Sequence, residues 1–548
     1  MDAMTRLLEA DAIARLADRD PTLFTDDPGL HASILNRLGW TRLAHEAADT
    51  LPLVMKLSSE IAHERFTDIV LLGMGGSSLA PLVMNEVLDS TEGAPRLHVL
   101  DSTAPSETHR LMAFLTPERT GFVVASKSGT TVEPLSLYAI FREWMDGALG
   151  REAAGAHFIV VTDRGTPLQQ RQQQDMMRVT INAPADVGGR FSALSAFGLV
   201  PAALAGLDVT ALIAHASAME EMCRLPARSN PAAQLAAWMV DAFEVGRDKL
   251  TLVTSPRYRS LGLWVEQLVA ESTGKRGIGI VPVLEDGSVH PSAYGDDRAL
   301  VVVREESAAD AAAHAQDARE TGTPVFELLV PEPAGIGVEF VRWEHAVALA
   351  GFLLGVNPFD EPNVAEAKAA TTGVLDGSVA VPAADGDIDG VAVTSAGNLV
   401  GSTLPPSLPQ ALAPLLDSLA EGSYLAILAY LPDSEALLGP LRTAAAAISS
   451  HRRVPVCVEL GPRYLHSTGQ LHKGGPATGS YLLITTRSDE DQWIPGQPFT
   501  LGALFRAQAE GDLVTLATHG RAVMRLDLAD ESPGAVGAAA RALTSAAQ

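Results

Sequence analysis

The chain has 548 residues, of which 47% are hydrophobic, and its formal net charge is −26. A chain of this length predicts two or three domains, each with its own core. The excess of acidic residues argues against nucleic acid and an anionic membrane surface as partners, because both repel a negative protein. An anionic ligand would therefore need a local positive pocket built from helix N-termini and a few basic side chains.

The two cysteines, Cys223 and Cys457, are too few for a disulfide framework, which fits a reducing cytoplasm. The first residues carry acids and lack a long apolar core, unlike a secretory signal. The apolar run at residues 346–356 is too short to span a bilayer and predicts a buried helix. We therefore expect a cytoplasmic protein without a membrane partner.

The first 60 residues place apolar side chains between acids and arginines, which predicts an N-terminal helical segment over residues 1–60. From residue 61 the pattern changes to short apolar runs, each followed by a turn and a helical pattern. Such alternation is typical of a parallel sheet with helices on both faces, so we predict an α/β domain over residues 61–235. Its expected strands are residues 68–72, 96–100, 121–125 and 157–161.

A similar α/β domain is predicted over residues 236–375, after a helical stretch at about residues 192–245. Its expected strands are residues 249–254, 279–283, 299–303 and 324–328. A linker rich in Gly, Pro and Asp at residues 381–390 precedes a smaller C-terminal domain, residues 390–548, of α/β or α+β type. The elements expected in this domain are strands at residues 424–428 and 480–484, a helix after Ser434 and a helix from Gly534.

Residues 73–78, with the sequence GMGGSS, form a glycine-rich turn between the first strand and a helix. Glycines such as Gly76 let the backbone approach a ligand, and a helix start presents free N–H groups with a positive dipole. The turn lacks the third glycine of the dinucleotide-binding spacing. For this segment alone, a tight turn without a ligand is the favoured interpretation.

Residues 126–131, with the sequence SKSGTT, follow the third strand and combine four hydroxyls with a lysine and a glycine. A capped helix start would explain some of these residues. We favour the binding of a small anion, because two such turns occur in one predicted sheet. Since ligands bind outside the carboxyl ends of parallel strands, both turns should lie at one edge.

Two further segments carry candidate chemistry. Arg190 follows two glycines; a loop arginine is usually a surface residue, and the functional alternative is a guanidinium held against a developing oxyanion. Gln267 and Glu271 lie four residues apart and share one face of a predicted helix. A solvated polar face is the default interpretation, but Glu271 stands at the helix end, before Ser-Thr-Gly-Lys, which favours a functional role.

Residues 464–475 bring together His466, His472, Lys473 and several glycines in a predicted loop. The two histidines lack the i,i+4 spacing of a helical zinc site, and no cysteine or acid stands near them in the sequence. Acid–base chemistry or contacts to sugar hydroxyls fit better. The chain has no hydrolase elbow of the form G-x-S-x-G where the anion site would need it.

Together these motifs resemble the glucose-6-phosphate isomerase family, whose members are built from two sugar-isomerase (SIS) domains. The resemblance covers roughly residues 60–370 and rests on five segments that follow the family order. They are residues 73–77, 126–131, 188–192, 267–275 and 357–368. The resemblance implies parallel sheets flanked by helices, interconversion of glucose 6-phosphate and fructose 6-phosphate, and no metal or redox cofactor.

The C-terminal part resembles the isomerase half of transaldolase/glucose-6-phosphate isomerase fusions, through residues 465–475, and we find no transaldolase half here. Two departures from the family stand out. The family's ring-opening histidine usually lies between the base and the catalytic lysine, whereas His466 lies beyond Lys368. In addition, Glu361 occupies a position where the family often has Gln, so a phosphate contact from this side chain is not expected.

The resemblance also implies roles for single residues. Glu271 would move a proton between C2 and C1 through a cis-enediolate, whose charge Arg190 would stabilise. His466 and Lys368 would open the sugar ring by proton transfer. The implied supporting residues are Gly76, Gln267 and Glu133, the last of them orienting Arg190. The implied phosphate ligands are Ser77, Ser126, Lys127, Ser128 and Thr131.

Two other functions fit the same fold, and the assembly of the chain is a separate question. A dual-specificity enzyme would also isomerise mannose 6-phosphate. A regulatory protein of the same fold would bind a sugar phosphate but would need no Glu271, Arg190 or Lys368, and the presence of all three favours an enzyme. Relatives are commonly dimers whose site borrows a histidine from the partner. We expect a homodimer here too, although His466 in the C-terminal domain would let one chain complete its own site.

Overall fold

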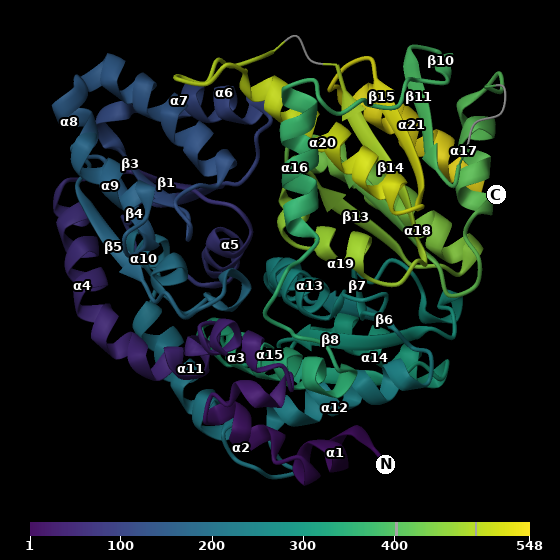
Figure 1. The fold of residues 1–548 in the computed structure, drawn as a ribbon, viewed down its shortest axis with the longest axis horizontal. Coiled ribbons are helices and arrows are strands. Elements are labelled where there is room, and N and C mark those ends of the chain that lie inside the picture. Colours follow the sequence, from purple (N-terminus) through teal and green to yellow (C-terminus); the bar gives the residue numbers. More distant parts are fainter. Residues whose placement is uncertain (400–403, 488–489) are drawn as a thin grey trace.

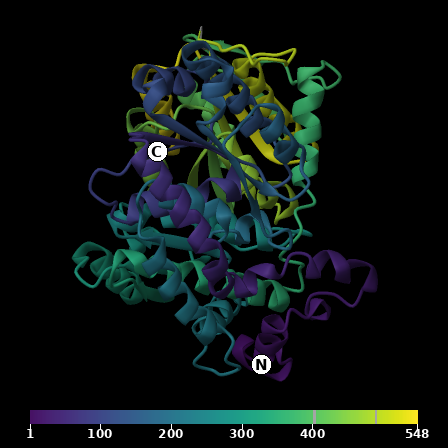
Figure 2. The same ribbon diagram turned by 90° about the vertical axis from the view of Figure 1, so that its left-hand side faces the viewer.

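The computed structural model describes residues 1–399, 404–487 and 490–548, which form three β-sheets flanked by helices (Figure 1). The first sheet lies at the upper left of this view, the third at the upper right and the second below them. Figure 2 shows the N-terminal helices at the end of the molecule opposite the C-terminal sheet. Among the described residues, we find no helix with the length and apolar character needed to cross a membrane.

The first sheet consists of parallel strands. They are β1 (Asp68–Leu72), β2 (Arg96–Leu100), β3 (Thr120–Ala125), β4 (Phe158–Asp163) and β5 (Val179–Ala183), in the order β2-β1-β3-β4-β5. Every residue of β1 and β3 is buried, because helices cover both faces, which explains their continuous apolar sequences. The four predicted strands are confirmed. β5 escaped prediction because it is a half-exposed edge strand with polar residues.

The second sheet is also parallel. Its strands are β6 (Lys249–Thr254), β7 (Val281–Glu285), β8 (Arg298–Arg304) and β9 (Val325–Leu329), in the order β7-β6-β8-β9. All four lie at the predicted positions, with small shifts at their ends. The expected fold of two parallel-sheet units is therefore confirmed.

The third sheet is mixed. Its strands are β10 (Gly386–Ile388), β11 (Val391–Gly397), β12 (Tyr424–Ala429), β13 (Val456–Leu460), β14 (Gly479–Thr486) and β15 (Ala522–Leu528), in the order β10-β11-β15-β14-β12-β13. The strands from β12 to β15 are parallel, whereas β11 runs antiparallel to β15 and to β10. The expected α/β or α+β domain is confirmed, but the residues predicted as a linker contain β10.

The helices follow the predicted order. The N-terminal segment forms α1 (Ala3–Glu9), α2 (Ala12–Ala17), α3 (Pro28–Leu35) and α4 (Leu43–His63). The first sheet carries α5 (Leu79–Val87), α6 (Pro105–Phe114), α7 (Val132–Leu149), α8 (Arg151–Gly155) and α9 (Pro167–Gln174). The predicted helical connection forms α10 (Ala196–Leu204), α11 (Val209–Cys223) and α12 (Pro231–Glu244).

The remaining helices belong to the second and third sheets. The second sheet is followed or covered by α13 (Arg259–Thr273), α14 (Ala309–Glu320), α15 (Ile336–Leu354) and α16 (Val364–Leu375). The C-terminal part adds α17 (Leu408–Asp417), α18 (Glu435–Arg452), α19 (Gly469–Gly474), α20 (Leu501–Thr518) and α21 (Pro533–Ala547). The buried apolar run predicted near residue 346 falls in α15, and the helices expected after Ser434 and from Gly534 are α18 and α21.

One continuous apolar core joins the N-terminal helices to the first two sheets. It includes Leu7 of α1, Trp40 before α4, Ile69 of β1 and Val301 of β8. The C-terminal sheet has one apolar cluster of its own, and a second cluster joins it to Ala270 of α13 and to Val281 and Val283 of β7. The N-terminal helices are thus part of the packing that holds the first two sheets together.

A buried ion pair joins the C-terminal part to the first sheet. Arg463 donates to both carboxylate oxygens of Asp101, at 2.9 and 2.8 Å, and its side chain also lies 3.0 Å from Asp433. The Arg463 side chain is 12% exposed and that of Asp101 only 2%. Since removing one partner of a buried pair leaves the other charge uncompensated, this contact should be costly to break.

We therefore expect Arg463→Ala to lower the free energy of unfolding by about 3–5 kcal/mol, because Asp101 stays buried without its counterion. Urea unfolding followed by circular dichroism measures the loss. The matched control is Arg452→Ala, which removes a half-exposed pair with Asp417 at 3.4 Å and should cost at most about 1 kcal/mol. Equal losses in the two variants would show that the Arg463 pair does not hold the domains together.

Candidate active site

The glycine turn after β1 packs tightly against two other parts of the chain. A Cβ at Gly76 would lie 2.2 Å from the carbonyl oxygen of Gly189, the residue before Arg190. Gly75 has a φ of +54°, and a Cβ there would lie 2.9 Å from the Cβ of His466. The turn therefore needs glycine for close backbone approach. Ser77 ends this turn and is partly exposed.

The hydroxyl-rich loop lies between β3 and α7, at the same sheet edge as the glycine turn, because β1 and β3 are parallel neighbours. Ser126 is buried, and its Oγ lies 2.9 Å from Oγ1 of Thr131. Thr131 occupies the N-cap position of α7 without a capping hydrogen bond from its side chain. The alternative of a simple side-chain cap at Thr131 is therefore wrong, and the positive end of α7 faces this loop.

The other two members of this loop differ in their contacts. Ser128 is exposed, and its hydroxyl lies 2.9 Å from that of Thr130. The Lys127 ammonium donates to Asp163 at 2.5 Å and to the carbonyl of Ala185 at 3.2 Å. The side chain of Lys127 is thus held by the neighbouring strand end, which leaves its backbone N–H as the group that can serve the loop.

Glu271 and Arg190 form a buried pair. Glu271 lies in the last turn of α13 with 8% of its surface exposed, and its Oε1 lies 3.3 Å from Nη1 of Arg190, which is 4% exposed. The interpretation of Gln267 and Glu271 as a solvated face is wrong, since both are buried. Burial raises the pKa of Glu271, the Arg190 charge opposes this shift, and Glu361 adds to it.

Arg190 is fixed by a set of further contacts. Its Nε donates to Ser272 at 2.9 Å, and its Nη2 donates to the carbonyls of Pro358 at 2.6 Å and Asp360 at 3.0 Å. Nη1 also donates to Glu361 at 3.2 Å. Glu361, the departure from the family pattern, therefore binds the guanidinium of Arg190.

The loop that holds Arg190 is itself held by a buried lysine. Lys275 donates to a carboxylate oxygen of Asp360 at 2.7 Å and to the carbonyls of Asn357 and Asp360. Burial lowers the pKa of Lys275 to about 8, although Asp360 opposes the shift. Lys275 is thus a positioning residue for the carbonyls that receive Arg190.

His466 reaches the first sheet from the C-terminal part of the chain. Its Nε2 lies 2.8 Å from Oε1 of Glu133, a buried residue in the first turn of α7. Gln508 of α20 donates to the same oxygen at 2.8 Å, and Thr103 donates to Gln508 at 2.7 Å. Glu133 therefore contacts His466 and not Arg190, which corrects the expectation that it orients the arginine.

The charge state of Glu133 follows from this network. Burial alone would raise its pKa, but the charge of His466, its hydrogen bond and the charge of Lys368 together lower the pKa below the ordinary value. An ionised Glu133 accepts hydrogen bonds from both His466 and Gln508. This arrangement places a proton on Nε2 of His466 and turns its Nδ1 away from the carboxylate.

Gln267 connects the histidine to the glutamate. Its Nε2 donates to the backbone carbonyl of His466 at 2.6 Å and lies 3.4 Å from Oε2 of Glu271. Its Oε1 is buried and has no hydrogen-bond partner among the residues that the structure describes. That acceptor, beside Glu271, is available to a hydroxyl group of a ligand.

Lys368, His472 and Lys473 stand apart from these contacts. Lys368 lies on α16 with an exposed side chain, and it is connected to the site through its charge acting on Glu133. The predicted loop at residues 464–475 contains α19, where His472 lies 3.3 Å from Glu459 and Lys473 lies 2.6 Å from Asp512. His472 and Lys473 are thus occupied within the C-terminal part.

Sequence reasoning missed several residues of this site. Gln508 and Thr103 give no local signal, because the hydrogen bond from Gln508 to Glu133 joins residues 375 positions apart. Lys275 stands in the recognised Glu-Ser-Thr-Gly-Lys segment, so its place in the motif was a usable signal.

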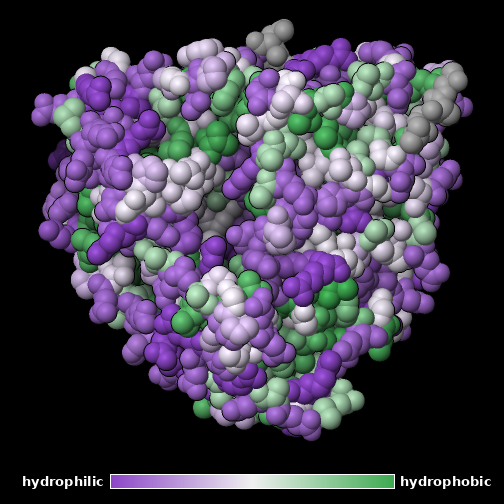
Figure 3. Space-filling view, in the orientation of Figure 1, coloured by the Kyte–Doolittle hydropathy of each residue, from purple (hydrophilic) through white to green (hydrophobic). Residues whose placement is uncertain are grey.

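Figure 3 shows a hollow near the centre of one face, between α5 and α16, two of the elements that border this cluster.

The arrangement can bind an anion and move a proton. A buried carboxylate with a raised pKa is suited to general acid–base catalysis near neutral pH. A fixed guanidinium beside it can stabilise negative charge that develops on a ligand. The hydroxyl loop and the N-terminus of α7 offer donors for a phosphate.

Comparison with known proteins gives a consistent answer. The family model described as "Phosphoglucose isomerase" matches residues 59–299. A glucose-6-phosphate isomerase of Rubrobacter xylanophilus is 30% identical over 397 residues, which are 64% of this chain and 89% of the relative. One from Thermus thermophilus is 30% identical over 379 residues, 61% of this chain and 89% of the relative.

Solved structures show the same fold. A hypothetical protein of Thermus thermophilus is 29% identical, with a TM-score of 0.60, over 68% of this chain and 96% of its own. A glucose-6-phosphate isomerase of Chlamydia trachomatis is 20% identical, with a TM-score of 0.51, over 66% of this chain and 78% of its own. A large part of the present chain thus lies outside each of these matches.

Gln508→Leu should raise the pKa of Glu133, because it removes a hydrogen bond that favours the ionised carboxylate. The measurement is the pH titration of the Glu133 side-chain carbon by NMR, in protein labelled at glutamate. The matched control is Gln316→Leu on the exposed face of α14, where the glutamine pairs with Glu320. An unchanged titration of Glu133 in the Gln508 variant would show that Gln508 does not support its charge.

Proposed function

This chain belongs to the phosphoglucose isomerase family, and we propose that Glu271 carries the proton in its interconversion of glucose 6-phosphate and fructose 6-phosphate. The observation that supports this role most strongly is the buried contact between Glu271 and Arg190. It sets a carboxylate that can take a proton from carbon beside a guanidinium that can stabilise the resulting anion. The rest of the mechanism follows from the neighbours of these two side chains.

The phosphate is proposed to bind at the carboxyl ends of β1 and β3. Ser126 and Thr131 are hydrogen-bonded to each other at the start of α7, and a phosphate can receive both hydroxyl protons together with backbone N–H groups. Ser128, Ser77 and the backbone of Lys127 complete the proposed set. The positive end of α7 supplies attraction in a chain of strongly negative charge.

Ring opening is assigned to His466 with Lys368. Opening a cyclic aldose moves a proton from the O1 hydroxyl and places one on O5. Glu133 fixes the proton on Nε2 of His466 and turns Nδ1 to the substrate side, where it can exchange these protons. Lys368, exposed and close enough to affect Glu133, supplies the second proton-transferring group.

Proton transfer follows on the open chain. Glu271 takes the proton from C2, the electrons of that C–H bond form the C1–C2 double bond, and the carbonyl electrons move onto O1 of a cis-enediolate. A proton then passes from the O2 hydroxyl to O1, and Glu271 delivers a proton to C1 as the carbonyl forms at C2. Arg190 stabilises the negative oxygen of this intermediate, while the unpartnered oxygen of Gln267 accepts a substrate hydroxyl. Positioned acid–base groups of this kind contribute about 10²–10⁴-fold each.

A purely regulatory sugar-phosphate-binding protein is the weaker alternative. Such a protein would have no use for a buried carboxylate and guanidinium, whose desolvation is costly unless their chemistry is needed. Use of mannose 6-phosphate as a second substrate stays a prediction that an assay decides.

The assembly and location of the protein are also part of this proposal. Glu133, Gln267, Glu271 and His466 all meet within one chain, so the proposed site needs no residue from a second subunit. The homodimer stays a prediction. Both cysteines are free and buried, which fits the cytoplasm that we propose as its location.

Glu271→Gln should lower kcat for isomerisation by about 10²–10⁴-fold or more, because the amide cannot take the proton, while sugar-phosphate binding is kept. A coupled assay with glucose 6-phosphate and with mannose 6-phosphate measures turnover, and calorimetry measures binding. The control is Glu320→Gln, an exposed acid on α14. Turnover that survives in the Glu271 variant would refute its role as the base.

Glu361→Gln should move the acid limb of the pH profile to lower pH. The Glu361 charge adds to the raised pKa of Glu271, and removing it makes the glutamate easier to ionise. Since the base must be ionised to act, activity should persist at lower pH. The measurement is kcat/KM against pH, with Glu366→Gln on α16 as the matched control. An unmoved acid limb would mean that Glu271 does not set it.

A further inference from the structure

The C-terminal sheet contains a topological switch point of its own. Strands β12 and β14 are parallel neighbours, but β12 leads to β13 on one side and β14 leads to β15 on the other. The chain therefore leaves the carboxyl ends of β12 and β14 in opposite directions, which opens a crevice there. In open α/β sheets, ligands bind at this place.

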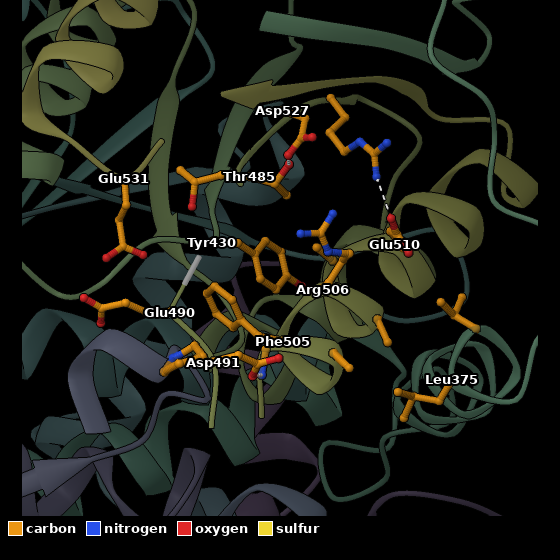
Figure 4. A pocket seen from close by; sticks show the side chains of 18 residues that line it. Leu375, Tyr430, Thr485, Glu490, Asp491, Phe505, Arg506, Glu510, Asp527 and Glu531 are labelled. Atoms are coloured by element: carbon orange, nitrogen blue, oxygen red, sulfur yellow. Dashed lines mark hydrogen bonds and ion pairs between the residues drawn. The ribbon is translucent and has the colours of Figure 1, made fainter. Parts of the chain in front are cut away.

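A cavity of about 450 Å³ occupies this crevice (Figure 4). Tyr430 directly follows β12, Thr485 and Thr486 end β14, and Asp527 lies near the end of β15. One face of α20 forms another wall, through Phe505, Arg506 and Glu510. The volume falls in the range of small-molecule sites.

The cavity holds an arginine without a partner. Arg506 makes no hydrogen bond or ion pair with any residue that the structure describes, and Figure 4 shows its guanidinium beside Tyr430 in the middle of the cavity. Arg525 pairs with Glu510 at 3.2 Å, and its Nε is buried with no hydrogen-bond partner in the described part of the chain. The exposed guanidinium of Arg506 thus retains unused donors toward the cavity, whereas Arg525 is held by Glu510.

The other walls are apolar or accept hydrogen bonds. The rings of Tyr430 and Phe505 meet edge to face with centroids 5.5 Å apart, and they form a surface for the C–H face of a small ligand. Acidic side chains outnumber the two arginines among the lining residues. A nucleoside triphosphate, with its several negative charges, would be repelled. Hydroxyl groups suit the carboxylates, because ionised Asp and Glu only accept hydrogen bonds.

We propose that this crevice is a second ligand site, which binds a small polyhydroxylated anion, either a sugar phosphate or a sugar acid. Arg506 receives the anionic group, the hydroxyls donate to Asp527 and its acidic neighbours, and the carbon skeleton lies against Tyr430 and Phe505. None of these residues belongs to the proposed isomerase site. The matched range of the family model ends at residue 299, before this sheet begins, and most of the lining residues belong to the C-terminal part.

The helix α20 separates the two sites. Arg506 and Gln508 are two residues apart and point to different sides of the helix, one toward the cavity and the other to Glu133. A ligand on Arg506 is therefore bound to the element that supports the proposed ring-opening histidine. Isomerase kinetics measured with and without the ligand report any such coupling.

The test is calorimetry on the full chain with four probes. Gluconate represents a sugar acid, sorbitol 6-phosphate a sugar phosphate that cannot be isomerised, glucose the uncharged skeleton and inorganic phosphate the charge alone. We expect gluconate, sorbitol 6-phosphate or both to bind at a site whose affinity falls at least about tenfold in Arg506→Ala. Binding of gluconate would identify the ligand as a sugar acid, and binding of sorbitol 6-phosphate would identify it as a sugar phosphate.

Control variants separate this site from the isomerase site. Ala503→Phe should fill the cavity and abolish the same binding, whereas Arg541→Ala, an exposed arginine on α21, should leave it unchanged. Ser126→Ala with Thr131→Val should weaken only sorbitol 6-phosphate at the isomerase site. The proposal is overturned if neither polyol anion loses affinity in Arg506→Ala, or if glucose or phosphate alone binds there as tightly. Isomerase turnover is assayed in every variant, so a failure of this site is distinguishable from a failure of the proposed function.

Discussion

The contact between Glu271 and Arg190 is the constraint on which the rest of the site depends. Two charges in a buried place are costly unless each keeps its partners, and here the partners come from three separate segments. Ser272 and the carbonyls of the loop at residues 357–361 hold the guanidinium, and Lys275 holds that loop. The glycine turn packs on the backbone that carries Arg190. The position of the base is thus set by packing well beyond its own helix.

The C-terminal part of the chain contributes side chains to this site. It supplies His466 and Gln508, which both contact Glu133 of the first sheet. The buried contact from Arg463 to Asp101 fixes the same two parts relative to each other. His466, which lies beyond Lys368 in the sequence, is therefore held beside Glu133 within a single chain.

The parts of the structure that sequence could predict are those with a local signal. Buried parallel strands such as β1 and β3 have unbroken apolar runs, and loops after them carry recognisable hydroxyls and glycines. Glu271 stood out through its position at a helix end. The edge strands β5 and β10 carry no such run, and the correct partner of Glu133 depends on contacts between residues hundreds of positions apart. Only the folded chain brings those side chains together.

The central claim is that a carboxylate moves a proton between C2 and C1. The most direct measurement is the appearance of solvent deuterium in the sugar phosphates during turnover in D₂O. A proton carried by Glu271 exchanges in part with solvent, so the account predicts deuterium at C1 of fructose 6-phosphate and at C2 of glucose 6-phosphate. Isomerisation over many turnovers without any incorporated deuterium would indicate direct hydride transfer between the carbons and would contradict the account.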